Sequence, residues 1–182
     1  MKCRLTHPPA AAAAFLSDCV PRPPVLLDVS MPISDDLRDL YQQVILDHSR
    51  HPRNHGELGG DCIHVHGDNP TCGDEIDLWL KLNPEGAIED VKFSGQGCAI
   101  SQASASMMTV KVKGASKAKA AGLLQDFRSV VTGEGQVADE DALGELQLLE
   151  GVQKFPQRVK CAMLAWRALE QALSEGSGDV HA

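Results

Sequence analysis

One segment in which every second residue is apolar constrains the fold most strongly. Such alternation is typical of a β-strand that buries one face. The apolar members are Ile76, Leu78, Leu80 and Leu82, and the residues between them are Asp77, Trp79 and Lys81. The turn-forming run Asn83-Pro84-Glu85-Gly86 comes next, and Val91 and Phe93 follow it. The pattern therefore predicts a β-hairpin, because two apolar segments flank a proline–glycine turn.

A third strand is predicted ahead of the hairpin, where Ile63 and Val65 alternate with histidines. Together these segments predict a small antiparallel three-stranded sheet with one buried face. The other apolar residues follow helical spacing, and we expect about five helices. Their predicted spans are Ser34 to about His51, about Ala99 to Lys113, Ser116 to Gly133, a short helix around Leu143 to Leu149, and Pro156 to about Ser174. The expected fold class is therefore α+β.

A chain of 182 residues is long enough for one domain with its own core. We expect this domain to span residues 31–175. Residues 1–30 are interpreted as a disordered extension, or as a stretch ahead of a true start at Met31, because their apolar run from Ala10 to Leu16 makes a poor signal peptide. Residues 176–182 are polar and are expected to form a frayed tail.

Composition argues against several functional classes. The net charge is −8, from 17 basic and 25 acidic residues, whereas nucleic-acid binding needs clustered positive charge. No run approaches the roughly 20 apolar residues that cross a bilayer, so we expect a soluble, cytoplasmic protein. The six cysteines are too sparse for the disulfide framework of a short secreted domain. Scattered cysteines in a reducing compartment more often bind metal or react.

Two of the cysteines lie where a thiolate would be stabilised. Cys98 follows Gly95-Gln96-Gly97 and precedes a predicted helix, and the positive end of a helix dipole favours thiolate. Cys161 lies on the last predicted helix, and Arg158 three residues earlier is its neighbour on one helix face. A cation beside a thiol also favours thiolate. The alternative for both thiols is an inert residue that only packs.

A third cysteine, Cys72, lies with Asp74 in a turn at the mouth of the hairpin, within the run Asn69-Pro70-Thr71-Cys72-Gly73-Asp74. Positions i and i+2 of an extended segment point the same way, so this thiol and this carboxylate can converge. Three thiolates and one carboxylate suit a tetrahedral Zn²⁺. Spacing alone supports such a site only weakly, because its residues come from three separate elements.

Five histidines lie close together in the sequence and could suggest a metal cluster: His48, His51, His55, His64 and His66. The first three bracket a predicted helix end, where the helix dipole favours cations. The last two alternate out of a strand and are the better candidates among the five. Cys62 is expected in the core. The sequence contains no glycine-rich phosphate loop and no Gly-x-Ser-x-Gly elbow.

Taken jointly, the motifs resemble a known family, the U-type iron–sulfur cluster assembly proteins (IscU and the NifU N-terminal domain), and its SufU branch in particular. The likeness covers about Leu40 to Leu173. It is carried by Ile45-Leu46-Asp47-His48 with Pro52-Arg53-Asn54, by the Cys72 run, by Gly97-Cys98-Ala99-Ile100-Ser101 with Ala103-Ser104-Ala105-Ser106-Met107-Met108, and by Phe155-Pro156 through Lys160-Cys161 to Trp166. IscU-type proteins have histidine in place of Lys160 and a Leu-Pro-Pro-Val-Lys motif that this chain lacks.

The resemblance implies a compact SufE/NifU-like domain with a zinc ion held by Cys72, Asp74, Cys98 and Cys161. It implies a sulfurtransferase that accepts persulfide sulfur from a SufS-type cysteine desulfurase and relays it to downstream cluster assembly proteins. Cys72 would be the acceptor, with Cys161 as the fallback, and Arg158 would reach into the partner's active site. Two alternatives stay open: a scaffold that binds an iron–sulfur cluster transiently, and a zinc-stabilised adaptor that only activates the desulfurase. A homodimer is also possible.

Overall fold

A computed structural model describes residues 35–174 and 178–181 of the chain. Its elements are α1 (Asp35–Arg50), β1 (Ile63–Asn69), β2 (Asp74–Leu82), β3 (Ile88–Gln96), α2 (Ala99–Val112), α3 (Lys117–Thr132), α4 (Glu140–Leu143), the 3-10 helix η1 (Gly144–Lys154), α5 (Pro156–Ser174) and β4 (Gly178–His181). The predicted α+β class is confirmed. The predictions for residues 1–30, for Met31 as the start and for Ser34 as a helix cap lie outside the described residues.

The sheet has four strands in the order β3-β2-β1-β4 and is mixed, which corrects the prediction of three antiparallel strands. β2 and β3 form the predicted hairpin, and β1 pairs with β2 antiparallel. β4 pairs with β1 in parallel, from Val65 opposite Gly178 to Asp68 opposite His181. β4 lies in the segment that we expected to be frayed. Its four residues contain one large apolar side chain, Val180, which packs against the core, so the alternation is too short to recognise in the sequence.

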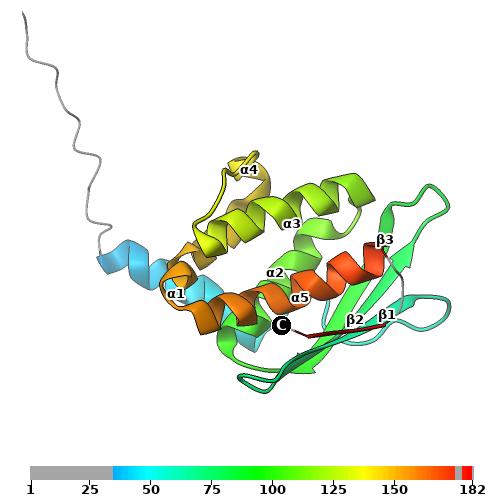
Figure 1. The fold of residues 1–182 in the computed structure, drawn as a ribbon, viewed down its shortest axis with the longest axis horizontal. Helices are drawn as coiled ribbons and strands as arrows, with labels where there is room; N and C mark the ends of the chain where they lie inside the picture. The colour runs from blue at the N-terminus through cyan, green and yellow to red at the C-terminus, as the bar shows by residue number, and fades with distance from the viewer. Residues whose placement is uncertain (1–34, 175–177, 182) are drawn as a thin grey trace, which may run out of the picture. The chain divides into compact units, whose positions relative to one another are not determined.

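Helices cover the inner face of the sheet, where α5 packs against β1 and β2 and α2 packs against β3 (Figure 1). A polar link within this layer joins α2 to α5: the indole of Trp166 donates to Ser104 Oγ (3.2 Å), and that hydroxyl donates to the carbonyl oxygen of Ala162 (2.6 Å). The Trp166 ring also stacks on Phe127 of α3 at a centroid distance of 4.7 Å. These buried contacts fix α5 on the sheet, and α5 carries Cys161.

Local sequence signals set the helix boundaries. Ser116 caps α3, because its side chain accepts a hydrogen bond from the backbone N–H of Lys119. Gly133 ends α3 in a left-handed conformation with φ 71°. Pro156 is the first residue of α5, as predicted. Among the helices of the described part, none is long and apolar enough to cross a membrane.

Candidate metal centre

The connection between β1 and β2, which we call the site loop (residues 69–74), positions the first two predicted ligands. Asn69 is the last residue of β1 and lies opposite Asp74, the first residue of β2. The backbone oxygen of Asn69 accepts from the N–H groups of Cys72 (3.2 Å) and Gly73 (2.8 Å), and its side-chain oxygen accepts from Thr71 N–H (3.1 Å). Gly73 has φ 72°, a conformation that favours glycine. The loop is therefore a tight, hydrogen-bonded turn.

The fold brings this loop against the first turns of α5. The sulfur atoms of Cys72 and Cys161 and one carboxylate oxygen of Asp74 all lie within 4.8 Å of one another. The two sulfur atoms are 3.5 Å apart. Cys72 is exposed, whereas Cys161 is only 1% exposed. The Asn69 side-chain amide lies 3.9 Å from the Cys161 sulfur, so the loop covers the buried thiol.

Asp74 is a buried carboxylate with one oxygen engaged and one oxygen unpaired. Its Oδ1 accepts from the backbone N–H of Cys98 at 2.9 Å, while the buried Oδ2 has no hydrogen-bond partner. Burial acts to raise the pKa of Asp74, but hydrogen bonds from Cys161, from the Cys98 backbone and from Cys72 outweigh burial and leave the pKa below its usual range. A buried anionic oxygen without a donor is the kind of atom that a cation would satisfy.

Gly97 allows this close approach of the Cys98 backbone to the carboxylate. A Cβ at residue 97 would lie 2.9 Å from both Cγ and Oδ1 of Asp74. A side chain at residue 97 would therefore push the Asp74 carboxylate out of its position, and glycine avoids this clash. Asn69 was not predicted as part of the site, although it stands inside the Cys72 run.

Cys98, the fourth predicted ligand, is half-buried and is the N-terminal cap residue of α2. It is not one of the three residues whose ligand atoms gather within 4.8 Å. Its backbone nevertheless borders the site, since the Cys98 N–H donates to Asp74 Oδ1. Interaction with Cys98, followed by interaction with Cys161, raises the pKa of Arg158. Burial raises the pKa of Cys161 above its usual range, and hydrogen bonds to Asp74 and Cys72 raise it further.

This donor set fits a borderline-soft divalent ion. Two thiol sulfurs and a carboxylate oxygen already converge, a third thiol stands beside them, and the unpaired Asp74 Oδ2 lacks a positive partner. Zinc takes sulfur and carboxylate ligands in a tetrahedral arrangement. The residues present therefore fit a zinc ion at Cys72, Asp74 and Cys161.

The five histidines considered as a metal cluster are not among the described residues that gather at this centre. His64 and His66 both contact Asp77 Oδ1 on the outer face of the sheet, at 2.9 and 3.0 Å. His48 is at the end of α1 but is buried, which the dipole argument did not anticipate. Its Nδ1 lies 2.8 Å from Ser106 Oγ and its Nε2 lies 3.3 Å from Glu145 Oε2.

Cys62 lies just before β1 and is half-buried outside the hydrophobic core, which corrects the prediction that it belongs to the core. Its thiol lies 3.6 Å from the backbone oxygen of Leu58, to which it donates. It therefore takes no part in the metal centre.

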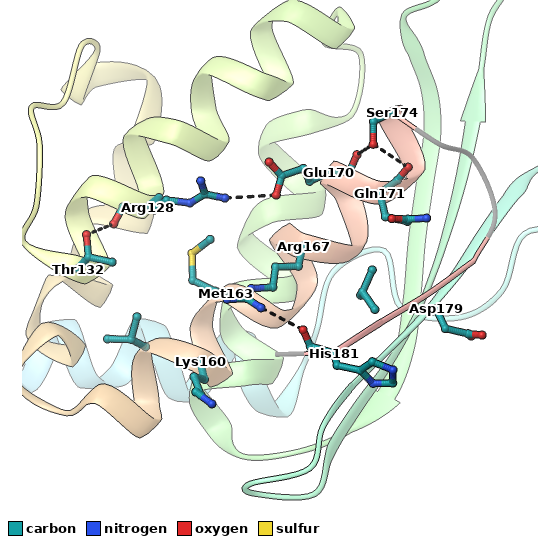
Figure 2. Close-up of a pocket in the computed structure, with 12 residues that line it drawn as sticks. Arg128, Thr132, Lys160, Met163, Arg167, Glu170, Gln171, Ser174, Asp179 and His181 are labelled. Atoms are coloured by element: carbon teal, nitrogen blue, oxygen red, sulfur yellow. Dashed lines mark hydrogen bonds and ion pairs between the residues drawn. The ribbon is translucent and has the colours of Figure 1, made fainter.

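A separate cavity of about 810 Å³ lies between α3, α5 and β4. Its lining includes Lys160, next to Cys161 in sequence, and Arg167, which Figure 2 shows reaching toward His181. None of Cys72, Asp74, Cys98 and Cys161 lines this cavity.

Comparison with known proteins identifies the family. The family model described as the NifU-like N terminal domain matches residues 40–162. The chain belongs to this family. Membership of the U-type iron–sulfur cluster assembly proteins, which the motifs predicted, is thereby confirmed. The matched range contains all four predicted ligands and the first seven residues of α5.

Two named relatives cover most of the chain. A Streptococcus pyogenes protein named iron–sulfur cluster assembly scaffold protein IscU is 48% identical over 146 residues, which is 80% of this chain and 89% of that protein. A Bacillus subtilis protein named zinc-dependent sulfurtransferase SufU is 45% identical over 148 residues, which is 81% of this chain and 99% of that protein.

Solved structures share the fold. The crystal structure of a hypothetical protein superimposes with a TM-score of 0.70 at 48% identity, covering 76% of this chain and 99% of the other. A Fervidobacterium islandicum protein, described as a candidate iron–sulfur cluster assembly scaffold for the SUF system, superimposes with a TM-score of 0.69 at 35% identity and covers 75% and 98%. This chain is therefore similar to NifU-like proteins in fold as well as in sequence.

Proposed function

We propose that this chain is a zinc-dependent sulfurtransferase that accepts persulfide sulfur from a SufS-type cysteine desulfurase and relays it to iron–sulfur cluster assembly. One observation carries the proposal: an exposed thiol, Cys72, lies 3.5 Å from a thiol, Cys161, that is 1% exposed. The pair therefore has one sulfur that a partner protein can reach and one that it cannot. The name of the Bacillus subtilis relative supports the same assignment.

The proposed ligands of the zinc are Cys72, Asp74, Cys98 and Cys161. When bound, a zinc ion keeps its cysteine ligands deprotonated and shields them from oxidation. The protein contributes rigidity, because Asp74 is held by the Cys98 backbone and Cys161 by α5. Cys72 is the ligand on the exposed turn, so it is the one that can leave the site with the smallest rearrangement.

Sulfur acceptance at Cys72 is a thiol–disulfide type of exchange. The Cys72 thiolate attacks the outer sulfur of the donor persulfide. A bond forms between Cys72 Sγ and that outer sulfur, the sulfur–sulfur bond of the donor breaks, and the donor cysteine leaves as a thiolate. No oxidant or reductant is consumed, because the transferred sulfur keeps its oxidation state.

Arg158 is the proposed contact with the partner's active site. It is exposed at the start of α5, and its pKa is raised first by Cys98 and then by Cys161. Its guanidinium thus combines closeness to the thiols with access to solvent. A cation there offsets the negative charge of the ligand set and of an incoming persulfide.

The test is to map the persulfide. The zinc-loaded chain is incubated with the cysteine desulfurase and L-cysteine, blocked with an alkylating reagent, digested and analysed by mass spectrometry. We expect one added sulfur on Cys72 and loss of that product, and of desulfurase stimulation, in Cys72→Ser. Cys62→Ser is the matched control and should behave like the unchanged protein.

Each other outcome has a defined meaning. An added sulfur that maps to Cys161 moves the acceptor role to the fallback residue. Stimulation without any added sulfur supports the adaptor alternative and refutes sulfur transfer.

A second candidate function, assembly of an iron–sulfur cluster on the same side chains, is favoured by the name of the Streptococcus pyogenes relative. Here iron and sulfide are the cargo that Cys72, Cys98 and Cys161 would hold. Anaerobic purification discriminates between the two functions: a colourless protein with one zinc per chain supports sulfur transfer, whereas a brown, iron-rich protein supports the scaffold. Asp74→Ala adds a second arm, because a cluster retained by that variant would also favour the scaffold.

A further inference from the structure

Strand β4 pairs with the part of β1 that runs directly into the site loop. The parallel register places His181 opposite Asp68, the residue that precedes Asn69. Because the two strands are in register, the position of β4 affects the backbone from which the site loop departs.

Three contacts hold β4 at this position. His181 Nδ1 contacts Asp68 Oδ1 across the strands. Arg167 of α5 donates through Nη1 to the backbone oxygen of His181 at 3.0 Å, a bond that Figure 2 marks. Val180 packs toward the core, and a Cβ at Gly67 would lie 3.1 Å from its Cγ2 atom. The strand is thus tied to β1 and to α5 at the same time.

The backbone next to Asp68 carries the whole site loop. Asn69 accepts the backbone bonds that form the turn at Cys72 and Gly73, and its amide lies against the Cys161 sulfur. A shift of Asp68 would therefore move the turn and uncover Cys161. None of Asp68, Arg167 and His181 is among the proposed zinc ligands.

We propose that β4 is a strap that holds the site loop closed over Cys161, with Asp68 and His181 as the positioning residues. Opening of the strap exposes a thiol that is otherwise 1% exposed. The proposal concerns the geometry of the thiols and rests on the proposed function only in treating this loop as the one that accepts sulfur.

The test measures how fast Cys161 is labelled by N-ethylmaleimide in the metal-free, full-length chain, with the site resolved by mass spectrometry. Asp68→Ala and His181→Ala each break the contact between these two partly exposed side chains. Loss of such a pair shifts the equilibrium between the closed and open loop by about 1.5- to fivefold. We expect Cys161 to be labelled faster by that factor in each variant. A variant that ends at residue 177 loses all of β4 and should be labelled faster still.

The controls separate positioning from general stability. Asp179→Ala is the matched substitution in β4, because Asp179 is exposed and lies opposite His66, whereas His181 lies opposite Asp68. It should leave the labelling of Cys161 unchanged. Labelling of Cys62 should stay unchanged in Asp68→Ala and His181→Ala, and the unfolding equilibrium should shift by no more than the same 1.5- to fivefold factor, measured by urea titration of tryptophan fluorescence.

Two results would overturn the strap. One is unchanged labelling of Cys161 in Asp68→Ala, His181→Ala and the shortened chain. The other is a parallel rise at Cys62, because that result would mean that β4 only stabilises the domain as a whole. Failure of sulfur transfer to Cys72 in the unchanged protein would refute the proposed function and would leave these labelling ratios as they are.

Discussion

Gly97→Ala should damage the metal centre without touching a ligand. The new Cβ would lie 2.9 Å from Cγ and Oδ1 of Asp74, about 0.5 Å closer than the 3.4 Å at which ordinary contact begins. Asp74 is 2% exposed and cannot move into solvent. Overpacking of this kind costs about 1–3 kcal/mol. Displacing Oδ1 also weakens its 2.9 Å bond from the Cys98 N–H, and hydrogen bonds to charged groups contribute about 1.5–3 kcal/mol.

Because the two costs overlap, the free energy of unfolding of the metal-free protein should fall by roughly 2–4 kcal/mol. The assay is urea unfolding followed by tryptophan fluorescence, with zinc content measured on the same samples. The zinc content of the purified variant should also fall, since Asp74 no longer sits where the thiols converge.

Gly122→Ala is the matched control. Gly122 lies in α3, and a Cβ there would meet nothing within 4 Å. This substitution should raise the free energy of unfolding by roughly 0.5–1 kcal/mol and leave zinc content unchanged. If Gly97→Ala unfolds at the same urea concentration as the unchanged protein and retains its zinc, the steric argument for the site is refuted.

Two further predictions concern stability. Burial lowers the pKa of His48 below its usual 6.5, so below about pH 6.5 the unfolded chain binds a proton that the folded chain does not. The free energy of unfolding should therefore decrease as pH falls below about 6.5. His48→Gln should make the free energy of unfolding less dependent on pH in urea titrations at several pH values, and an unchanged dependence would contradict the assignment. Gly95→Ala should lower the free energy of unfolding by about 3 kcal/mol or more, because residue 95 has φ 149° and its Cβ would lie 2.2 Å from the backbone oxygen of Glu75. A thermal midpoint equal to that of the unchanged protein would contradict this prediction, since it would show that β2 and β3 can separate there without cost.

Local signals made most elements predictable. Alternation and a four-residue turn predicted the β2–β3 hairpin, and Ser116, Gly133 and Pro156 marked the ends of helices as expected. β4 escaped prediction because its stability comes from a partner strand more than 100 residues earlier and not from its own four residues. A pattern within the chain carries no information on such a pairing until the fold is known.

The candidate site was predictable in its residues but not in its geometry. Cys72, Cys98 and Cys161 stood out by context, yet only the packing of α5 against the sheet brings Cys161 to Cys72. Asn69 was missed because its role is to accept the hydrogen bonds of a turn, which has no pattern of its own. The burial of His48 was missed for a related reason, since its partners, Ser106 and Glu145, lie on distant elements.

The strand register where β1 leads into β2 restricts changes in chain length at the site loop. Asn69 and Asp74 form a directly opposed pair, and side chains alternate between the two faces of a sheet with a period of two residues. Inserting or deleting a single residue in β2 after Asp74 would turn that carboxylate to the wrong face, and a change between Asn69 and Asp74 would misplace Cys72. Surface connections usually tolerate changes in length. In this connection, insertions and deletions should be absent from any descendant that keeps the chemistry.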